Sequence, residues 1–266
     1  MKEQAVDLVR NVQAPAEKLN ILREYLQAFV MRSLHESEAY ACLSFVGGTA
    51  LRFVYDLPRF SEDLDFSLEN PTGYEPLQWL KKLKRDMTLA GFNTAISWND
   101  RKTVHTGWVK VAGLLKETGL AAMTGQNLSI KIEIDSRPPA GAETVATVIN
   151  RHLMFALRHH SLSSLMAGKV HALMTRKYSK GRDWYDLLWY LSRRPSSEPN
   201  LTLLQNALDQ TQGRGVLSAK GWREILFEIV LGMDFPKLLQ DVEPFLERPQ
   251  DARLLTVAHF QSLLSA

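Results

Sequence analysis

The stretch from Phe45 to Ser67 constrains this chain more than any other part of it, and reads FVGGTALRFVYDLPRFSEDLDFS. An apolar, strand-like run ends in Gly47-Gly48, where the lack of side chains lets a backbone turn approach a phosphate closely. Thr49 follows with a hydroxyl, and residues 50–55 have the pattern of a helix whose N-terminal amides point back at this turn. The sequence therefore predicts an anion-binding turn between a strand and a helix.

A half-buried strand is predicted at residues 61–67, where polar and apolar side chains alternate. The alternation places Asp63 and Asp65 on one face, about 7 Å apart along the strand. Two such carboxylates repel each other unless a hard cation bridges them, and Mg²⁺ prefers this sparse set completed by water and substrate phosphate. The pair predicts a divalent metal, and Ser61 lies on the same side as a further phosphate contact. The alternative is an ordinary turn followed by solvent-facing aspartates of an edge strand.

The glycine turn followed by Asp-x-Asp resembles the first motif of the polymerase-beta-type nucleotidyltransferase superfamily. More narrowly, GGTALR with RFSEDLDF resembles the AbiEii (abortive-infection, MenT-like) toxin nucleotidyltransferases. Thr49 stands where the wider superfamily usually has Ser, and thirteen residues, slightly more than usual, separate it from Asp63. The resemblance implies that Gly47, Gly48 and Thr49 bind nucleotide and that Asp63 and Asp65 hold metal.

A third carboxylate is predicted on the strand Leu128–Asp135, which alternates apolar and charged residues. Nucleotidyltransferases of this superfamily commonly place an acidic residue on a strand beside Asp-x-Asp, where it completes the metal site or helps to deprotonate the acceptor hydroxyl. We expect Glu133 in this catalytic and metal-binding place, with Asp135 as the second choice. The alternative is a solvated face on which Lys131 and Glu133 pair with each other.

A second informative stretch lies between Ser163 and Leu191, where two helices are predicted, at 165–176 and 182–191. Its pattern K-x₆-R-x₅-R-D-x-Y-D-L resembles the second conserved block of the AbiEii family. The catalytic-site lysine and aspartate of that block map onto Lys169 and Asp183.

The charges of this block suit a triphosphate. Lys169 would place a compact charge against it, and Arg176 or Arg182 would add planar phosphate contacts. Asp183 would orient the lysine or the nucleotide. The alternative is an internal salt bridge between Arg182 and Asp183 that compensates a helix dipole.

The order of predicted elements gives an α+β fold: a nucleotidyltransferase-like mixed sheet flanked by helices, followed by a C-terminal helical bundle. We expect a catalytic domain at 1–155 with N-terminal helices, and a mainly helical domain at 156–266 that contributes Lys169 and Asp183 to the site. Further predicted helices are 16–37, 74–90, 201–210, 221–231, 235–246 and 251–264, and further extended segments are 92–98, 105–115 and 142–157.

Composition excludes several classes of protein. The single cysteine, Cys42, rules out an internal disulfide or a thiolate zinc cluster. The sequence has neither a signal-peptide pattern nor a run of about 18 apolar residues, so we expect a cytoplasmic protein without a membrane partner. The net charge of +3 permits nucleic acid as a partner without requiring it.

The resemblance implies the toxin of a toxin–antitoxin pair in antiviral (abortive-infection) defence, with an NTP donor, Mg²⁺ or Mn²⁺ as cofactor and a cognate antitoxin as partner. In related members the acceptor is the 3′ end of tRNA, where added nucleotides block aminoacylation. Basic residues that would favour RNA are Lys81, Lys82, Lys84, Arg85, Arg101, Lys102, Arg176, Lys177, Lys180 and Arg182.

Two alternatives remain open. One is the same transfer to a protein hydroxyl (AMPylation) or to an aminoglycoside-like small molecule. The other is a catalytically silent binding module, against which the intact Asp63, Asp65 and Lys169 argue.

Overall fold

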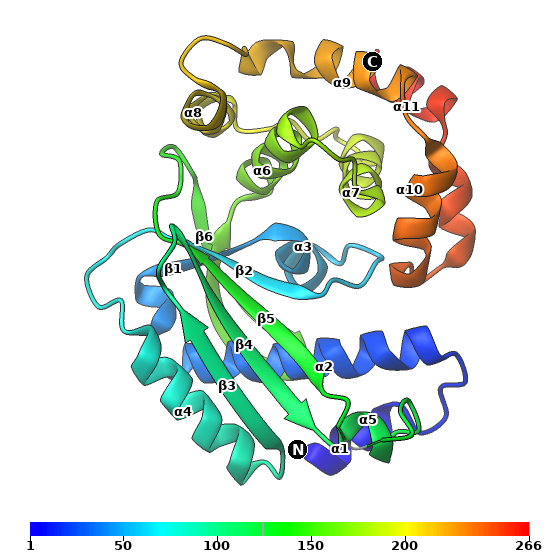
Figure 1. Ribbon diagram of the computed structural model, residues 1–266. Coiled ribbons are helices and arrows are strands. Elements are labelled where there is room, and N and C mark those ends of the chain that lie inside the picture. Colours follow the sequence, from blue (N-terminus) through cyan, green and yellow to red (C-terminus); the bar gives the residue numbers. More distant parts are fainter. Residues whose placement is uncertain (124, 266) are drawn as a thin grey trace. The chain divides into compact units, whose positions relative to one another are not determined.

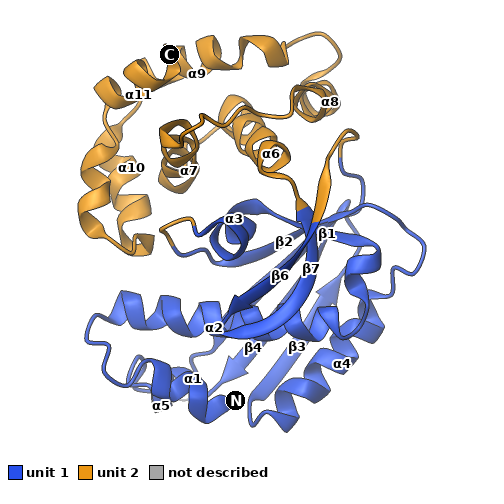
Figure 2. Cartoon of the chain, turned by 180° about the vertical axis from the view of Figure 1, so that it is seen from behind, with its two compact units in different colours: residues 1–56, 60–138, 146–159 blue, residues 57–59, 139–145, 160–266 orange. Residues whose placement is uncertain are grey.

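The computed structural model (Figure 1) describes residues 1–123 and 125–265 and divides into two compact units. Unit 1 comprises residues 1–56, 60–138 and 146–159, and unit 2 comprises 57–59, 139–145 and 160–266 (Figure 2). The sequence placed the division after residue 155 and anticipated neither short segment of unit 2. Residue 266, the last of the predicted helical domain, lies outside the described residues.

Seven strands form one mixed sheet in the order β3-β4-β5-β2-β1-β7-β6; Figures 1 and 2 together label all of them. The strand β2 pairs antiparallel with β1 and parallel with β5, so the two strands that carry the predicted carboxylates are direct neighbours. The strands are β1 (Leu43–Val46), β2 (Asp63–Leu68), β3 (Asn93–Asn99), β4 (Val104–Ala112), β5 (Leu128–Asp135), β6 (Thr144–Arg151) and β7 (Leu153–His160).

Unit 1 buries one face of this sheet under helices. The alternate residues Ile130, Ile132 and Ile134 of β5 are buried, and α2 packs against that strand while α4 packs against β3. Each buried isoleucine contributes about 1.5–3 kcal/mol, and a slip of one residue would expose all three, so burial sets the register. The helices are α1 (Lys2–Leu8), α2 (Pro15–His35), α3 (Gly47–Tyr55), α4 (Pro76–Leu89) and α5 (Leu114–Glu117).

Unit 2 is a bundle of six helices among the described residues, held by buried aromatic side chains. Trp184 of α7 meets Phe260 of α11 edge-on, with ring centroids 5.4 Å apart. A Cβ at Gly181 would overlap the Leu238 carbonyl, so glycine permits the close approach of α7 and α10. The helices are α6 (Leu162–Thr175), α7 (Gly181–Ser192), α8 (Leu201–Gln212), α9 (Trp222–Leu231), α10 (Phe235–Val242) and α11 (Val257–Leu264).

The predicted α+β class, with a mixed sheet flanked by helices and a C-terminal helical bundle, is confirmed. Several predicted elements differ from the structure at their ends, three of them because a short helix or a 3₁₀ turn replaces part of the predicted element. The strand expected at 105–115 stops at Ala112, because Gly113 has a φ of +78° and starts the short helix α5.

The other two differences are in unit 2. The helix expected at 235–246 ends at Val242, and a 3₁₀ turn that contains Pro244 follows it. The helix expected at 251–264 is a 3₁₀ segment, Pro249–Leu254, followed by α11, which Thr256 caps. Across the described residues, no helix combines the length and apolar character needed to cross a bilayer.

Candidate active site

The predicted anion-binding turn is a direct junction between β1 and α3. The helix begins at Gly47 itself, whose φ of +77° is strained for any residue with a Cβ. Within the described residues no side chain caps this helix start. The helix dipole favours negative charge beside the first backbone N–H groups of α3.

The carboxylate of Asp65 lies against this junction. A Cβ at Gly47 would overlap Asp65 Oδ2 and lie 3.0 Å from Asp65 Cβ, and Val46 is the register partner of Asp65. Glycine is thus required for two reasons: the left-handed backbone and the space that the carboxylate fills. The structure brings together the glycine turn and the second aspartate, as the sequence predicted.

Thr49 makes a different contact from the one expected. It is fully buried, and its hydroxyl donates to the backbone carbonyl of Asp63. The side chain therefore joins α3 to the start of β2 and has no proton left for a phosphate. A phosphate contact from Thr49 would come from its backbone N–H.

Strand register places Glu133 and Asp135 at different positions relative to Asp65. In the parallel pair, Asp65 lies opposite Glu133, whereas Asp135 lies opposite Ser67. The structure therefore places the first-choice carboxylate, Glu133, beside Asp65.

Lys131 pairs with Glu133, as the alternative interpretation of this strand predicted. Its Nζ lies 2.9 Å from Glu133 Oε1, and its register partner is Asp63. The hydrogen bond to Glu133 raises the pKa of Lys131, and the charges of Glu133, Asp63 and Asp65 add to this effect. The two side chains can meet because they lie two residues apart on the same face of the strand. We call Gly47, Asp63, Asp65, Lys131 and Glu133 the sheet site.

The donor set of the sheet site fits a divalent metal that is shared with substrate. Mg²⁺ is usually held by one or two protein carboxylates together with phosphate oxygens and water, which Asp63 and Asp65 can supply. Over the part of the chain that is described, no three His, Cys, Asp or Glu side chains are grouped as metal ligands. Glu133 pairs with Lys131 instead, so its metal-binding role stays a prediction.

The loop into β2 is held from α2. Gln27 is 1% exposed, and its Nε2 donates to the carbonyls of Ser61 and Glu62 at 3.0 and 2.9 Å. The predicted phosphate contact of the Ser61 side chain stays a prediction. Beside this loop is an open cavity of about 480 Å³, whose lining includes Asp63, Lys131 and the partly exposed Trp108.

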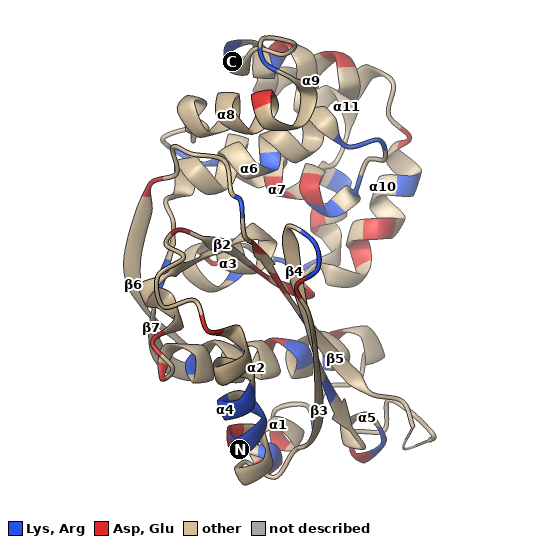
Figure 3. Ribbon diagram, turned by 60° about the vertical axis from the view of Figure 1, so that its left-hand side comes forward, with Lys and Arg blue, Asp and Glu red and all other residues tan. Residues whose placement is uncertain are grey.

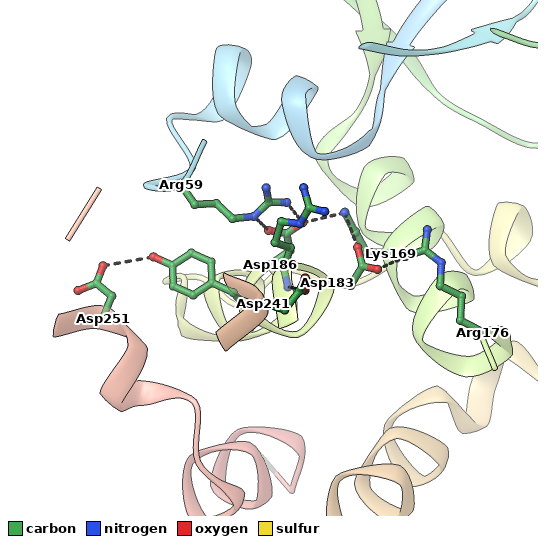
Figure 4. Close-up of polar contacts among 9 residues, drawn as sticks. Arg59, Lys169, Arg176, Asp183, Asp186, Asp241 and Asp251 are labelled. Atoms are coloured by element: carbon green, nitrogen blue, oxygen red, sulfur yellow. Dashed lines mark hydrogen bonds and ion pairs between the residues drawn. The ribbon is translucent and has the colours of Figure 1, made fainter. Parts of the chain in front are cut away.

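A second group of charged residues lies within unit 2 (Figure 4). Lys169 of α6 donates to Asp183 Oδ1 and Asp186 Oδ2 of α7, both at 2.8 Å. Arg176 pairs with the other oxygen of Asp183. Arg59 binds Asp186 through two hydrogen bonds of 2.6 Å. We call these five residues the charge cluster.

Most side chains of the charge cluster are largely buried, which is unusual for charged residues. The side chains of Arg59 and Asp186 are 2% and 0% exposed, and that of Lys169 is 13% exposed. Burial alone would lower the pKa of Lys169, but the charges of Asp183 and Asp186 outweigh it and raise that pKa. Burial would raise the pKa of Asp183, but Lys169 and Arg176 together bring it to about 2. The lysine is charged and the aspartate ionised at neutral pH.

The sequence anticipated only part of this cluster. Of the two roles expected for Asp183, contact with the lysine or with the nucleotide, the structure shows the contact with Lys169, and Arg176 joins it. Arg182, expected at a phosphate, stacks its guanidinium 4.3 Å from the ring centroid of Phe245, so phosphate binding by Arg182 stays a prediction.

Arg59 and Asp186 were missed as site residues. One signal was available, since Asp186 follows Asp183 by three residues and falls on the same helix face. Its partner Arg59 lies 127 residues away, and no local pattern links them.

Comparisons with known proteins agree with these observations. A family model described as "Nucleotidyl transferase AbiEii toxin, Type IV TA system" matches residues 29–260. No curated protein matches the chain.

Two solved structures from Helicobacter pylori share the fold. JHP933 is 20% identical, with a TM-score of 0.50 over 91% of this chain and 92% of that chain. A protein described as a candidate nucleotidyltransferase is 20% identical, with a TM-score of 0.51 over 90% and 94%.

Proposed function

We propose, from the premise that this chain belongs to the AbiEii nucleotidyl transferase toxin family, that it transfers a nucleoside monophosphate from an NTP to the 3′ end of tRNA. Nucleotidyl transfer is the activity of the family. The tRNA acceptor, the divalent metal and a cognate antitoxin are the parts that we propose. The family's description as a type IV toxin–antitoxin system supports the antitoxin.

The reaction is an in-line displacement at the α-phosphorus. The acceptor 3′-oxygen forms the new bond to phosphorus, the bond from phosphorus to the bridging oxygen breaks, and pyrophosphate leaves. The first backbone N–H groups of α3, at Gly47, Gly48 and Thr49, hold the β and γ phosphates. Glu133 accepts the proton of the attacking hydroxyl. A Mg²⁺ or Mn²⁺ ion held by Asp63 and Asp65 would supply charge neutralisation at the phosphate oxygens.

The position of Asp65 against Gly47 carries this proposal. A carboxylate beside a helix N-terminus competes with a phosphate for the same amides, unless a cation joins the two anions. This arrangement suits a metal–triphosphate complex better than it suits a free anion.

Lys169 and Arg176 are the residues that we assign to the leaving pyrophosphate. An ammonium has three N–H donors, and among the described residues Asp183 and Asp186 accept two of them. The third can serve a phosphate oxygen. Arg176 is 44% exposed and keeps donors for the same group.

The segment between α6 and α7 supports a nucleic-acid acceptor. It holds Arg176, Lys177 and Lys180, and Tyr178 among them is 72% exposed. Basic side chains bind the phosphates of a nucleic acid, and an exposed aromatic ring can stack on a base. On α4, by contrast, Lys82 is paired with Glu36 and Asp86, so that basic helix (Figure 3) has less charge to offer RNA.

The test is a labelling experiment with purified protein, total tRNA, Mg²⁺ and each α-labelled NTP in turn. We expect label on tRNA with at least one NTP, and a loss of about a hundredfold or more in the Asp63→Ala/Asp65→Ala variant. Omitting the metal should have the same effect. The comparison of Glu133→Gln with Asp135→Asn identifies the third carboxylate, because only the former should abolish transfer.

Two results would contradict parts of this proposal. Absence of label on tRNA with all four NTPs would reject the tRNA proposal and direct the search to protein and small-molecule acceptors. Label that persists in the double-aspartate variant would show that the sheet site does not perform the reaction.

A further inference from the structure

Asp186 shares its carboxylate between two cations. Its Oδ1 accepts from Arg59 Nε at 2.6 Å, and its Oδ2 accepts both from Arg59 Nη2 at 2.6 Å and from Lys169 Nζ at 2.8 Å. The side chain of Asp186 is 0% exposed. A bidentate guanidinium pair of this kind is both strong and geometrically specific.

The charge balance of the cluster depends on Arg59. With it, three cations (Arg59, Lys169, Arg176) face two anions (Asp183, Asp186), and the cluster carries a net charge of +1. Without it, Lys169 and Arg176 would be matched by the two aspartates. Opposite charges bind each other strongly at low dielectric, so Lys169 would then be held by its own carboxylates rather than by a phosphate.

We propose that Arg59 is a positioning residue which neutralises Asp186 and thereby leaves the Lys169 ammonium oriented but still able to bind an anion. Asp186 orients the ammonium of Lys169. Arg59 neutralises the negative charge of Asp186, so that the positive charge of Lys169 can still attract an anion. The identity of the anion as a triphosphate rests on the proposed function. The pairing of Arg59, Asp186 and Lys169 does not.

The backbone around Arg59 is anchored as well. Arg59 forms an isolated β-bridge with Leu246, and the N–H of Glu247 donates to the carbonyl of Pro58 at 3.3 Å. Residues 57–59 belong to unit 2, although α3 precedes them and β2 follows them in the sequence. The residue that balances Lys169 therefore comes from the connection between the glycine turn and the Asp-x-Asp strand.

The competing explanation is a buried ion pair that only supports folding. The two explanations differ in what they predict for Lys169. If Arg59 only holds the fold, its loss and the loss of Asp186 should both loosen the cluster. If Arg59 balances charge, the two losses should act on the lysine in opposite directions, because Arg59 lowers the pKa of Lys169 whereas Asp186 raises it.

The experiment is competitive acetylation of Lys169 with acetic anhydride at a fixed neutral pH, read by mass spectrometry in the full-length protein. The acetylation rate at Lys169 is divided by the rate at the exposed Lys110, which corrects for differences in the concentration of acetic anhydride. Only a neutral amine reacts, and a change of 1 in pKa alters the neutral fraction about tenfold. The readout needs neither substrate nor activity, so it remains valid if tRNA is not the acceptor.

We expect Arg59→Gln to slow acetylation of Lys169 about threefold or more, and Asp186→Asn to accelerate it by a similar factor. Arg59→Lys keeps the charge and should stay within about twofold of the wild type. Acceleration in Arg59→Gln would overturn the proposal. If Arg59→Gln does not fold, acceleration in Arg59→Lys would overturn it equally, because that variant loses the bidentate contact but not the charge.

Kinetics then locate the effect in the reaction. Arg59→Gln should raise KM for the NTP with a smaller change in kcat, because it weakens anion binding. Asp186→Asn should lower kcat with little change in KM, because Lys169 keeps its charge but loses the contact that orients it. Equal changes in both variants would contradict the positioning role, whereas absence of transfer by the wild type would contradict only the proposed function.

Discussion

At the scale of single residues, Gly47 shows how one position meets two demands. Its φ of +77° disfavours every residue with a Cβ, and the volume that a Cβ would fill is taken by the Asp65 carboxylate. The same glycine thus starts α3 and admits the carboxylate to its N-terminus. A substitution there changes the backbone and the proposed metal ligand together.

We predict that Gly47→Ala loses at least about tenfold in nucleotidyl transfer and about 2 kcal/mol in the free energy of unfolding. The strain comes from the left-handed backbone, and the methyl group would also displace Asp65. Transfer assays and chemical denaturation measure the two effects.

Gly168 provides the matched control. It lies within α6, and no described atom outside its local helix lies within 4 Å of the Cβ that alanine would add. Gly168→Ala should therefore raise stability by about 0.5–1 kcal/mol. A Gly47→Ala variant as stable as Gly168→Ala would show that the junction is not strained.

At the scale of elements, the pairing of β2 with β5 determines the composition of the sheet site. The register sets Asp63 opposite Lys131 and Asp65 opposite Glu133, so a cation lies among three carboxylates. At the proposed metal site, the positive charge of this ammonium offsets part of the negative charge that would attract a divalent ion. Lys131 is then a competitor of the metal.

We predict that Lys131→Met binds Mn²⁺ about threefold to tenfold more tightly than the wild type, because it removes a positive charge close to the three carboxylates. Titration followed by electron paramagnetic resonance measures free Mn²⁺ without any need for activity.

Lys110→Met is the control for this change. Lys110 is exposed on the neighbouring strand β4, and its register partner is the uncharged Ser129. Its removal should leave Mn²⁺ binding unchanged. Weaker binding in Lys131→Met would show that the lysine supports the metal site rather than competing with it.

At the scale of the whole molecule, the two units do not follow the order of the sequence. Unit 2 takes residues 57–59 from the middle of unit 1, and with them the guanidinium that neutralises its buried Asp186. A buried carboxylate that loses its partner costs about 3–5 kcal/mol. The helical unit is therefore incomplete when it is made from the C-terminal part of the chain alone.

This incompleteness predicts that one substitution has different effects in two proteins. Asp186→Asn should lower the melting temperature of the full-length chain, where it breaks the pair with Arg59. In a fragment of residues 160–266, which lacks Arg59, the same change should lower the melting temperature by less, because the bidentate pair is already absent and only the contact with Lys169 is lost. Circular dichroism of the four proteins measures both effects. An equal loss of stability in the two proteins would contradict the role of residues 57–59.

Most of the fold could be predicted because its signals are local. The strand at residues 128–135 was predicted with its observed bounds, since alternating burial is written directly into LSIKIEID. Several helix ends were not predicted, because capping and 3₁₀ turns such as Pro249–Leu254 depend on contacts made elsewhere in the chain.

The sequence by itself determined the family, the α+β class, the glycine turn with its two aspartates, and the positions of Lys169 and Asp183 on two consecutive helices. Each of these rests on residues that are neighbours in sequence or repeat with the period of one element. Only the tertiary structure decided that Glu133 rather than Asp135 lies beside Asp65, that Lys131 lies among the carboxylates, and that Arg59 completes the charge cluster. These outcomes depend on strand register and on a pair of residues 127 positions apart, which chain folding alone brings into contact.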